Sequence, residues 1–314
     1  MRLAHSSLFG LILTVPILCL SLTSASAADC DGRLIEDEML VASPLCLPET
    51  AERIVVLDPF FSLGMALELE LPVVAAPLTG MSDLDLKARA EAAGVADIGS
   101  VLEPSIESVV AAQPDLIIGS AVAESYYPML SQIAPTALIG VGETDWREYE
   151  RMIARISDRE DEFEQQLAKL DKRIDQLRPK IPDTKVSIIR ITPWDFQVYL
   201  DSSSAYGPFA LLRELGVKRT EYETDSAGLD MKRPDWEKLE GLDGDILLYI
   251  IGGMNNSAET GRLDEVRGNP LWQMLPAVQS GKVYPINPGI WMEFSGIASA
   301  HRVLDDVERL VIGE

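Results

Sequence analysis

The sequence has little histidine, little cysteine and few positively charged side chains, and each shortage excludes a class of protein. It contains 2 histidines in 314 residues, and its 27 lysines and arginines face 50 acidic residues, for a net charge of -23. Such an acidic chain repels nucleic-acid phosphates and anionic lipids, so we expect neither as a partner. The lack of histidine argues against a zinc or manganese cluster, and we predict no metal site made by the protein itself.

The motifs of common enzyme classes are absent as well. Gly252-Gly253 follows a predicted strand but lacks the glycine spacing of a phosphate-binding loop. The G-x-S-x-G motif of serine hydrolases is also missing. His301 lies in a predicted helix, where we favour a structural role over a catalytic one. We therefore predict a protein that is not an enzyme, and keep an exported two-lobed enzyme as an alternative.

The first 27 residues have the composition of a secretory signal peptide. Arg2 supplies a positive charge, residues 8–22 form a mostly apolar run, and Ala25-Ser26-Ala27 is a typical cleavage site. Neither Cys19 nor Cys30 follows the small residue that lipoprotein processing requires. We therefore expect a soluble mature protein that begins near residue 28 and carries no lipid.

Two cysteines, Cys30 and Cys46, remain after this cleavage. In an exported protein a disulfide between them is the favoured interpretation, with a pair of metal ligands as the alternative. A disulfide across so short a loop stabilises the fold by about 3 kcal/mol in the loop-entropy estimate.

Residues 144–178 form the longest stretch without glycine or proline. Apolar residues recur there at steps of mostly three and four, Asp145 provides a helix cap, and Pro179 ends the pattern. We predict a single helix, roughly 50 Å long, that connects two bodies. A coiled-coil arm is the alternative, although the apolar spacing departs from a strict heptad.

The segments on either side of this helix, 28–143 and 179–314, have similar patterns in which apolar strands alternate with helices. Predicted strands include 53–58, 73–76 and 115–119 in the first segment, and 185–191 and 245–251 in the second. The alternation indicates parallel sheets, so we predict two Rossmann-like α/β lobes joined by a single long helix.

Ligands of such sheets bind beyond the carboxyl ends of the strands. The aromatic, polar and charged residues at these positions are our candidates for ligand contact: Phe60, Ser62, Tyr126, Tyr127, Arg190, Trp194, Met254 and Trp291. Aromatic and methionine side chains offer broad contact to a bulky ligand, and arginine binds anionic oxygens. Packing within a lobe is the alternative for Phe60 and Tyr127, and a structural salt bridge is the alternative for Arg190.

Several short motifs carry a family resemblance across most of the chain. They are Arg53-Ile-Val-Val-Leu-Asp58, Pro104-Ser-Ile-Glu107, Gln113-Pro-Asp-Leu-Ile-Ile-Gly119, Ile133-Ala-Pro135, Gly268-Asn-Pro-Leu-Trp272 and Gly281-Lys-Val-Tyr284. Taken in this order around the long helix, they resemble the periplasmic substrate-binding proteins of ABC importers for iron–siderophore complexes, the class III periplasmic binding proteins.

The resemblance implies a monomer in the periplasm that captures a ferric siderophore between its lobes and delivers it to an inner-membrane ABC permease. Iron would be held by the siderophore, and no other cofactor is expected. Trp291 matches a tryptophan that lines the pocket in hydroxamate binders, whereas Val101 replaces their arginine, which disfavours a hydroxamate ligand. Arg190, with Lys232 or Arg233, would supply positive charge to an anionic complex.

The resemblance also implies acidic residues that dock onto the permease. The position of the first docking glutamate falls near Gly64, so Glu68 and Glu70 are the candidates there, and Glu214 is the candidate on the second lobe. A receptor for haem or cobalamin is the alternative within the same class. In that case Tyr126 or His301 would approach the metal.

Overall fold

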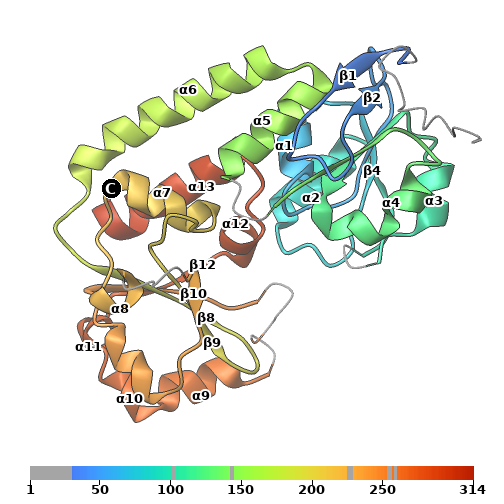
Figure 1. Ribbon diagram of the computed structural model, residues 1–314. Coiled ribbons are helices and arrows are strands. Elements are labelled where there is room, and N and C mark those ends of the chain that lie inside the picture. The colour runs from blue at the N-terminus through green and yellow to red at the C-terminus, as the bar shows by residue number, and fades with distance from the viewer. Residues whose placement is uncertain (1–29, 101–102, 142–144, 225–228, 253–256, 258–259) are drawn as a thin grey trace, which may run out of the picture.

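Residues 30–100, 103–141, 145–224, 229–252, 257 and 260–314 are described by a computed structural model. They form two α/β lobes side by side, connected by a helical segment (Figure 1). Within this part of the chain, no helix is both long enough and apolar enough to span a membrane. The predicted signal peptide, Met254, Val101 and Thr144 lie outside the described residues.

The N-terminal lobe is built on a five-stranded parallel sheet. Its strand order is β5 (Ala96–Asp97), β4 (Val73–Ala76), β3 (Ile54–Val56), β6 (Leu116–Ser120) and β7 (Thr136–Ile139). The connecting helices are α1 (Leu63–Glu68), α2 (Leu84–Ala92), α3 (Ile106–Ala111) and α4 (Tyr127–Leu130). The central strands β3 and β6 are fully buried, which explains why they are continuous apolar runs in the sequence.

A small antiparallel pair precedes this sheet, formed by β1 (Arg33–Ile35) and β2 (Leu45–Leu47). The disulfide Cys30–Cys46 closes this segment, with the two Cα atoms 5.6 Å apart. The predicted pairing of the cysteines is therefore confirmed.

The C-terminal lobe has a mixed sheet. Its order is β10 (Met231–Lys232), β9 (Phe196–Tyr199), β8 (Val186–Ile191), β11 (Ile246–Ile250) and β12 (Val283–Ile286). The last three strands are parallel, whereas β9 and β10 are antiparallel to their neighbours. The short loop between β8 and β9 allows only an antiparallel return, because a parallel one needs a crossover of a dozen or more residues.

Seven helices of the described residues belong to the C-terminal lobe. They are α7 (Gly207–Leu215), α8 (Glu221–Thr224), α9 (Arg262–Gly268), α10 (Pro270–Gln273), α11 (Pro276–Ser280), α12 (Pro288–Met292) and α13 (Ile297–Val307). Helix α13 packs against α1 of the other lobe as well as against α6 and α7. It is therefore part of the contact between the lobes.

The prediction of one unbroken helix over 144–178 is wrong. The segment forms two helices, α5 (Trp146–Ser157) and α6 (Glu160–Leu177), and Asp158 between them has a left-handed backbone with φ of 57°. The helices fold back on each other, since Arg151 Nε lies 2.7 Å from Glu164 and Arg147 lies 3.5 Å from Asp171. At 18 residues, α6 is about 27 Å long. It packs on α7 and α13 of the C-terminal lobe, whereas α5 packs on α1 and β7 of the N-terminal lobe (Figure 1).

Burial explains the break. Ile153 and Ile156 on α5, and Phe163 and Leu170 on α6, are all buried in one core. A straight helix would carry one of these two apolar stripes away from that core, and only polar residues lie between Ile156 and Phe163. Aspartate is among the few residues other than glycine that adopt the left-handed conformation at low cost. Tertiary packing therefore overrides the local helical pattern.

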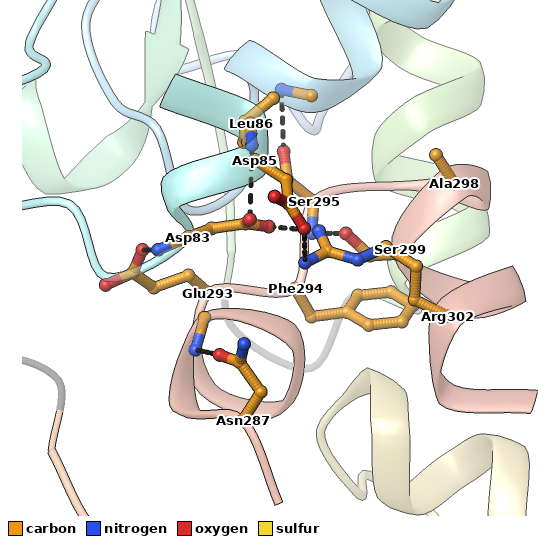
Figure 2. A network of polar contacts seen from close by, with 12 residues as sticks. Asp83, Asp85, Leu86, Asn287, Glu293, Phe294, Ser295, Ala298, Ser299 and Arg302 are labelled. Carbon is orange, nitrogen blue, oxygen red and sulfur yellow. Dashed lines mark hydrogen bonds and ion pairs between the residues drawn. The ribbon is translucent and has the colours of Figure 1, made fainter. Parts of the chain in front are cut away.

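A polar network joins the lobes near the start of α2 (Figure 2). Glu293 of the C-terminal lobe accepts hydrogen bonds from the backbone N–H groups of Ser82 and Asp83, each at 2.8 Å. Arg302 of α13 donates to the Asp83 carboxylate at 2.5 Å and to Asp85 at 3.2 Å. Asp83 is buried, so this ion pair holds α13 against α2.

Candidate ligand-binding site

A cavity of about 490 Å³ lies where the two lobes and α5 meet. Most of its lining is aromatic or polar: Phe61, Met65, Val141, Asp145, Trp146, Tyr149, Gln197, Tyr199, Ser203, Ser204, Ala205, Tyr206, Gly207, Ala210, Arg213, Asp230, Met231, Arg233 and Phe294. The volume is in the usual range for sites that bind small molecules.

Helix α5 and the N-terminal lobe supply one wall. Asp145 caps α5 by accepting a hydrogen bond from the backbone N–H of Arg147, so the first turn places Trp146 and Tyr149 at the cavity. Phe61 packs against Tyr149 with ring centres 6.0 Å apart, and Trp146 meets Phe294 edge-on at 5.3 Å. The indole N–H of Trp146 is buried and has no hydrogen-bond partner among the described residues.

The C-terminal lobe supplies the opposite wall. Gln197 and Tyr199 alternate with Val198 on β9, so both point to the same face of the sheet and reach the cavity. The Tyr206 hydroxyl accepts a hydrogen bond from the backbone N–H of Phe294 at 2.8 Å. This bond fixes two aromatic rings beside one another at the cavity, and burial raises the pKa of Tyr206 far above its ordinary value.

The charged residues of the cavity are mostly engaged by neighbours. Asp230 accepts hydrogen bonds from Ser202 at 2.6 Å and Ser204 at 2.5 Å. Arg233 forms an ion pair with Asp195, and Arg213 lies 4.0 Å from Asp201. These groups have partners without any ligand.

Arg190 is different. It lies on β8 directly opposite Gln197 of β9, and side chains of directly opposed residues share a face of the sheet. Its side chain is buried, its Nε has no hydrogen-bond partner, and the described residues offer it no ion pair. The positive charge is close enough to Tyr206 to lower the pKa of that hydroxyl against the effect of burial. The predicted structural alternative, a salt bridge, is not found among the described residues.

Ser62, a predicted ligand contact, is buried behind the cavity wall. Its hydroxyl donates to Asp58 at 3.1 Å and lies 2.9 Å from the Tyr149 hydroxyl. Asp58 also accepts hydrogen bonds from the backbone N–H groups of Phe61 and Ser120, at 2.8 and 2.9 Å. Burial raises the pKa of Asp58, although these bonds lower it in part. The network fixes the loop that carries Phe61.

None of the predicted contact residues that the structure describes lines this cavity. Phe60 is half-buried next to Phe61, which does line it. Tyr126 and Tyr127 are half-buried and pack against the core of the N-terminal lobe, which is the packing role we gave as the alternative for Tyr127. Trp194 is 76% exposed in the loop between β8 and β9.

Trp291 does not face the cavity. Its side chain is fully buried, and its indole N–H donates to Asp306 at 2.8 Å. It packs against Phe209 with ring centres 6.0 Å apart. This tryptophan is a core residue of the C-terminal lobe in this structure, and the adjacent Phe294 is the residue that reaches the cavity.

The three proposed docking glutamates lie in different surroundings. Glu70 is exposed. Glu68 accepts a hydrogen bond from the backbone N–H of Ala298, so its carboxylate lies at the contact between the lobes. Glu214 forms a two-point ion pair with Arg147, with both distances 2.8 Å. Within the described part of the chain, Glu70 is the one of the three that makes no such contact.

The other candidate residues from the sequence have structural roles. Lys232 donates to the backbone oxygen of Tyr222 and lies over that ring. The ring nitrogen of His301 lies 3.2 Å from the Arg173 guanidinium, and burial and that charge lower its pKa. Among the described residues no three histidine, cysteine or acidic side chains are grouped closely enough to hold a metal ion.

Sequence reasoning missed most of the residues around the cavity. In the sequence, Trp146 and Tyr149 belong to the apolar residues of the predicted connecting helix, and the sequence alone does not show that the start of this helix lines a cavity. Tyr206 and Phe294 are separated by 88 residues yet are hydrogen-bonded. An aromatic residue followed by the Gly-Pro start of a helix, as at Tyr206, is a local sign of this site, and so is Phe61, which follows a strand between the candidates Phe60 and Ser62.

Residues 54–288 match the family of periplasmic binding proteins. The chain belongs to this family. The match covers both lobes and the helices between them, and it agrees with a cavity enclosed by two lobes. The resemblance drawn from the sequence motifs is therefore confirmed.

Individual relatives support the same assignment. The chain is 27% identical to the Fe(3+)-citrate-binding protein YfmC of Bacillus subtilis, over 99% of both chains. It is 30% identical to the ferric enterobactin-binding periplasmic protein FepB of Escherichia coli, over 66% of this chain and 67% of the relative. The crystal structure of Staphylococcus aureus SirA complexed with staphyloferrin B superposes with a TM-score of 0.73 and 19% identity, over 88% of this chain and 97% of SirA. This last likeness establishes the two-lobed fold.

Proposed function

We propose that this protein captures a ferric siderophore in the cavity between its lobes and delivers it to an ABC importer. The position of the cavity supports this proposal, because residues of both lobes and of α5 line it. Its aromatic walls suit a bulky ligand with extended apolar and aromatic parts. Relatives of this chain bind ferric citrate and ferric enterobactin.

Arg190 favours an anionic complex within this class. A buried guanidinium without a partner is costly. Arg190 does not line the cavity, but it lies opposite Gln197, which does, so an anionic ligand in the cavity would compensate its charge. Trp146 offers an unpaired donor that does line the cavity. Iron would enter and leave as part of the ligand, with no cofactor resident in the protein.

The remaining parts of the proposal concern export and partners. We propose that residues 1–27 are cleaved and that the mature protein works as a soluble periplasmic monomer without a lipid anchor. Exposed Glu70 is the candidate for contact with the permease. Mass spectrometry of the protein isolated from its native cell will give the mature N-terminus and reveal any attached lipid.

Fluorescence titration tests the ligand. Ferric citrate, a ferric catecholate, a ferric hydroxamate, haem and cobalamin are each added to the purified protein. We expect saturable quenching by an anionic ferric complex, chiefly through Trp146, so that W146F loses most of the signal change. Saturation by haem or cobalamin alone would overturn the proposal, and so would chemical conversion of the bound ligand.

The R190M variant tests the charge. Loss of one charge-assisted pair should weaken binding of the anionic complex by about 10-fold or more. R178M is the matched control, because Arg178 is exposed at the end of α6. An equal effect of both variants would mean that Arg190 has no specific role in binding.

A further inference from the structure

Two glutamates from different elements meet at the start of α13. Helix α13 has Gly296 at its N-cap, which has no side chain to accept the first backbone N–H groups. Glu68 of α1 supplies the missing cap from the other lobe, accepting a hydrogen bond from the backbone N–H of Ala298 at 3.0 Å. The N-terminus of α13 in the C-terminal lobe is therefore capped by the carboxylate of Glu68 from the N-terminal lobe.

Glu150 of α5 lies at the same place. A Cβ added to Gly296 would be 3.1 Å from a carboxylate oxygen of Glu150 and 3.1 Å from one of Glu68, so the two groups share one small space. Glu150 is fully buried, and neither of its carboxylate oxygens has a hydrogen-bond partner. A buried, unpaired carboxylate is strongly disfavoured in its ionised form.

The surrounding charges do not compensate this pair. Burial raises the pKa of Glu68 to about 7, whereas the Ala298 N–H and the charge of Arg89 on α2 lower it in part. Burial and then the charge of Glu68 raise the pKa of Glu150 well above its ordinary value, whereas the nearby backbone N–H of Ile297 and the charge of Arg147 lower it in part. Arg147 is the cation that acts on Glu150, but its guanidinium is committed to Glu214. From α13, the neighbouring Gly296, Ile297 and Ala298 are uncharged.

We propose that Glu68 and Glu150 form a protonation-dependent latch between the lobes. With a proton on the pair, α1 and α5 pack against the start of α13. When both carboxylates are ionised, their repulsion in a buried space loosens this contact. The latch goes beyond ligand capture and does not depend on which ligand the cavity holds.

The latch lies directly behind the cavity wall. Met65 is three residues before Glu68, and its Cγ would be 2.9 Å from a Cβ at Gly296. Tyr149 immediately precedes Glu150, and Phe294 is two residues before Gly296. All three of these residues line the cavity. A change in the latch therefore moves the surface that a ligand would contact.

The sign of the pH effect follows from the raised pKa values. A carboxyl whose pKa is higher in the folded protein favours the folded state most at low pH, below the ordinary glutamate pKa. This contribution is lost as the pH rises through the folded-state value, which is about 7 for Glu68 and well above the ordinary glutamate value for Glu150. We therefore expect the lobes to be held most firmly in mildly acidic conditions.

Urea unfolding of the unliganded protein at pH 5 to 8.5 tests the latch. The ratio of folded to unfolded protein should fall with rising pH by at least about 10-fold in the wild type. In E150Q, which keeps the shape and removes one charge, this fall should be smaller, and E150Q should be more stable than the wild type at pH 8.5. In the double variant E68Q/E150Q the fall should shrink to within about 3-fold, because burial still raises the pKa of Glu68 when Glu150 is neutral. E162Q is the matched control, because Glu162 is exposed on α6, and it should keep the wild-type pH dependence.

A carboxyl ¹³C NMR titration of the wild type provides a measurement that does not rely on a variant. We expect a glutamate carboxyl that titrates near pH 7 or above, and E68Q should lower the pKa of the remaining Glu150. Ordinary pKa values for every glutamate would overturn the proposal. An E150Q variant that folds but retains the wild-type pH dependence would overturn it too. Both readouts use protein without ligand, so they are independent of the binding experiments.

Discussion

Asp58 and Glu150 are both buried carboxylates next to the cavity wall, but they differ in their hydrogen bonding. Asp58 accepts three hydrogen bonds, from the N–H groups of Phe61 and Ser120 and the hydroxyl of Ser62. Neither carboxylate oxygen of Glu150 has a hydrogen-bond partner among the described residues, and the nearby N–H of Ile297 only partly offsets its charge. Burial raises the pKa of both groups, but only Asp58 has bonds from its own lobe that stabilise its charge. The first carboxylate organises a loop, whereas the second is held in place by its neighbours.

The comparison separates two uses of a buried acid. An aspartate that satisfies several backbone N–H groups fixes local structure whenever it is ionised. A buried glutamate without hydrogen-bond donors makes the stability of the fold depend on pH, because burial destabilises the ionised carboxylate much more than the protonated one. We expect isosteric amide substitutions at the two sites to act in opposite directions.

The D58N variant should give the largest effect. The amide keeps one acceptor oxygen but places an NH₂ group 2.9 Å from the donor N–H of Ser120, so at least one charge-assisted bond is lost and a buried donor is left unpaired. We expect a loss of about 3 kcal/mol in the free energy of unfolding at pH 7. D243N, at an exposed aspartate, should change it little. A D58N protein as stable as the wild type would remove the contrast with Glu150.

The G64A variant tests how tightly the lobes meet. A Cβ at Gly64 would lie 2.3 Å from the backbone oxygen of Ser295, so α1 and the start of α13 must move apart. We expect a loss of about 2 kcal/mol, together with a weaker pH dependence because the glutamate pair is separated. G268A is the control, since nothing lies within 4 Å of a Cβ there. Urea unfolding at two pH values measures both effects.

The S62A variant should have the smallest effect. It removes the hydroxyl that connects Asp58 to Tyr149, but it leaves the two backbone bonds to Asp58 in place. We expect a loss of about 1 kcal/mol. S131A, at an exposed serine, is the matched control. A loss in S62A as large as in D58N would mean that the hydroxyl, and not the backbone, stabilises the Asp58 charge.

Much of the fold could be predicted from the sequence. The buried strands β3, β6, β8 and β11 coincide with mostly apolar runs, because strands covered on both faces need apolar residues on both sides. The disulfide and the family were predicted correctly as well. The strands and the disulfide depend on residues that are close in the sequence, and the family motifs occur in a fixed order. Both kinds of feature can therefore be recognised in the sequence.

The site was harder to predict. Trp291 occupies a loop-like sequence context flanked by glycine and proline, but the packing of α12 and α13 buries it. Arg190 was identified because a charge inside an apolar strand is unusual, and the structure leaves it without a partner among the described residues. The residues around the cavity come from α1, α5, β9, α7 and the segment before α13. No linear spacing connects them.

By itself, the sequence determined which segments form the main strands and that two similar lobes flank a helical region. Hydrophobic period, capping residues and turn residues act over a few positions, so they are visible in the chain. The tertiary structure alone decided that the helical region breaks at Asp158 and that Glu68 caps a helix of the other lobe. Both depend on burial and contacts between distant residues, which exist only when the lobes are packed together.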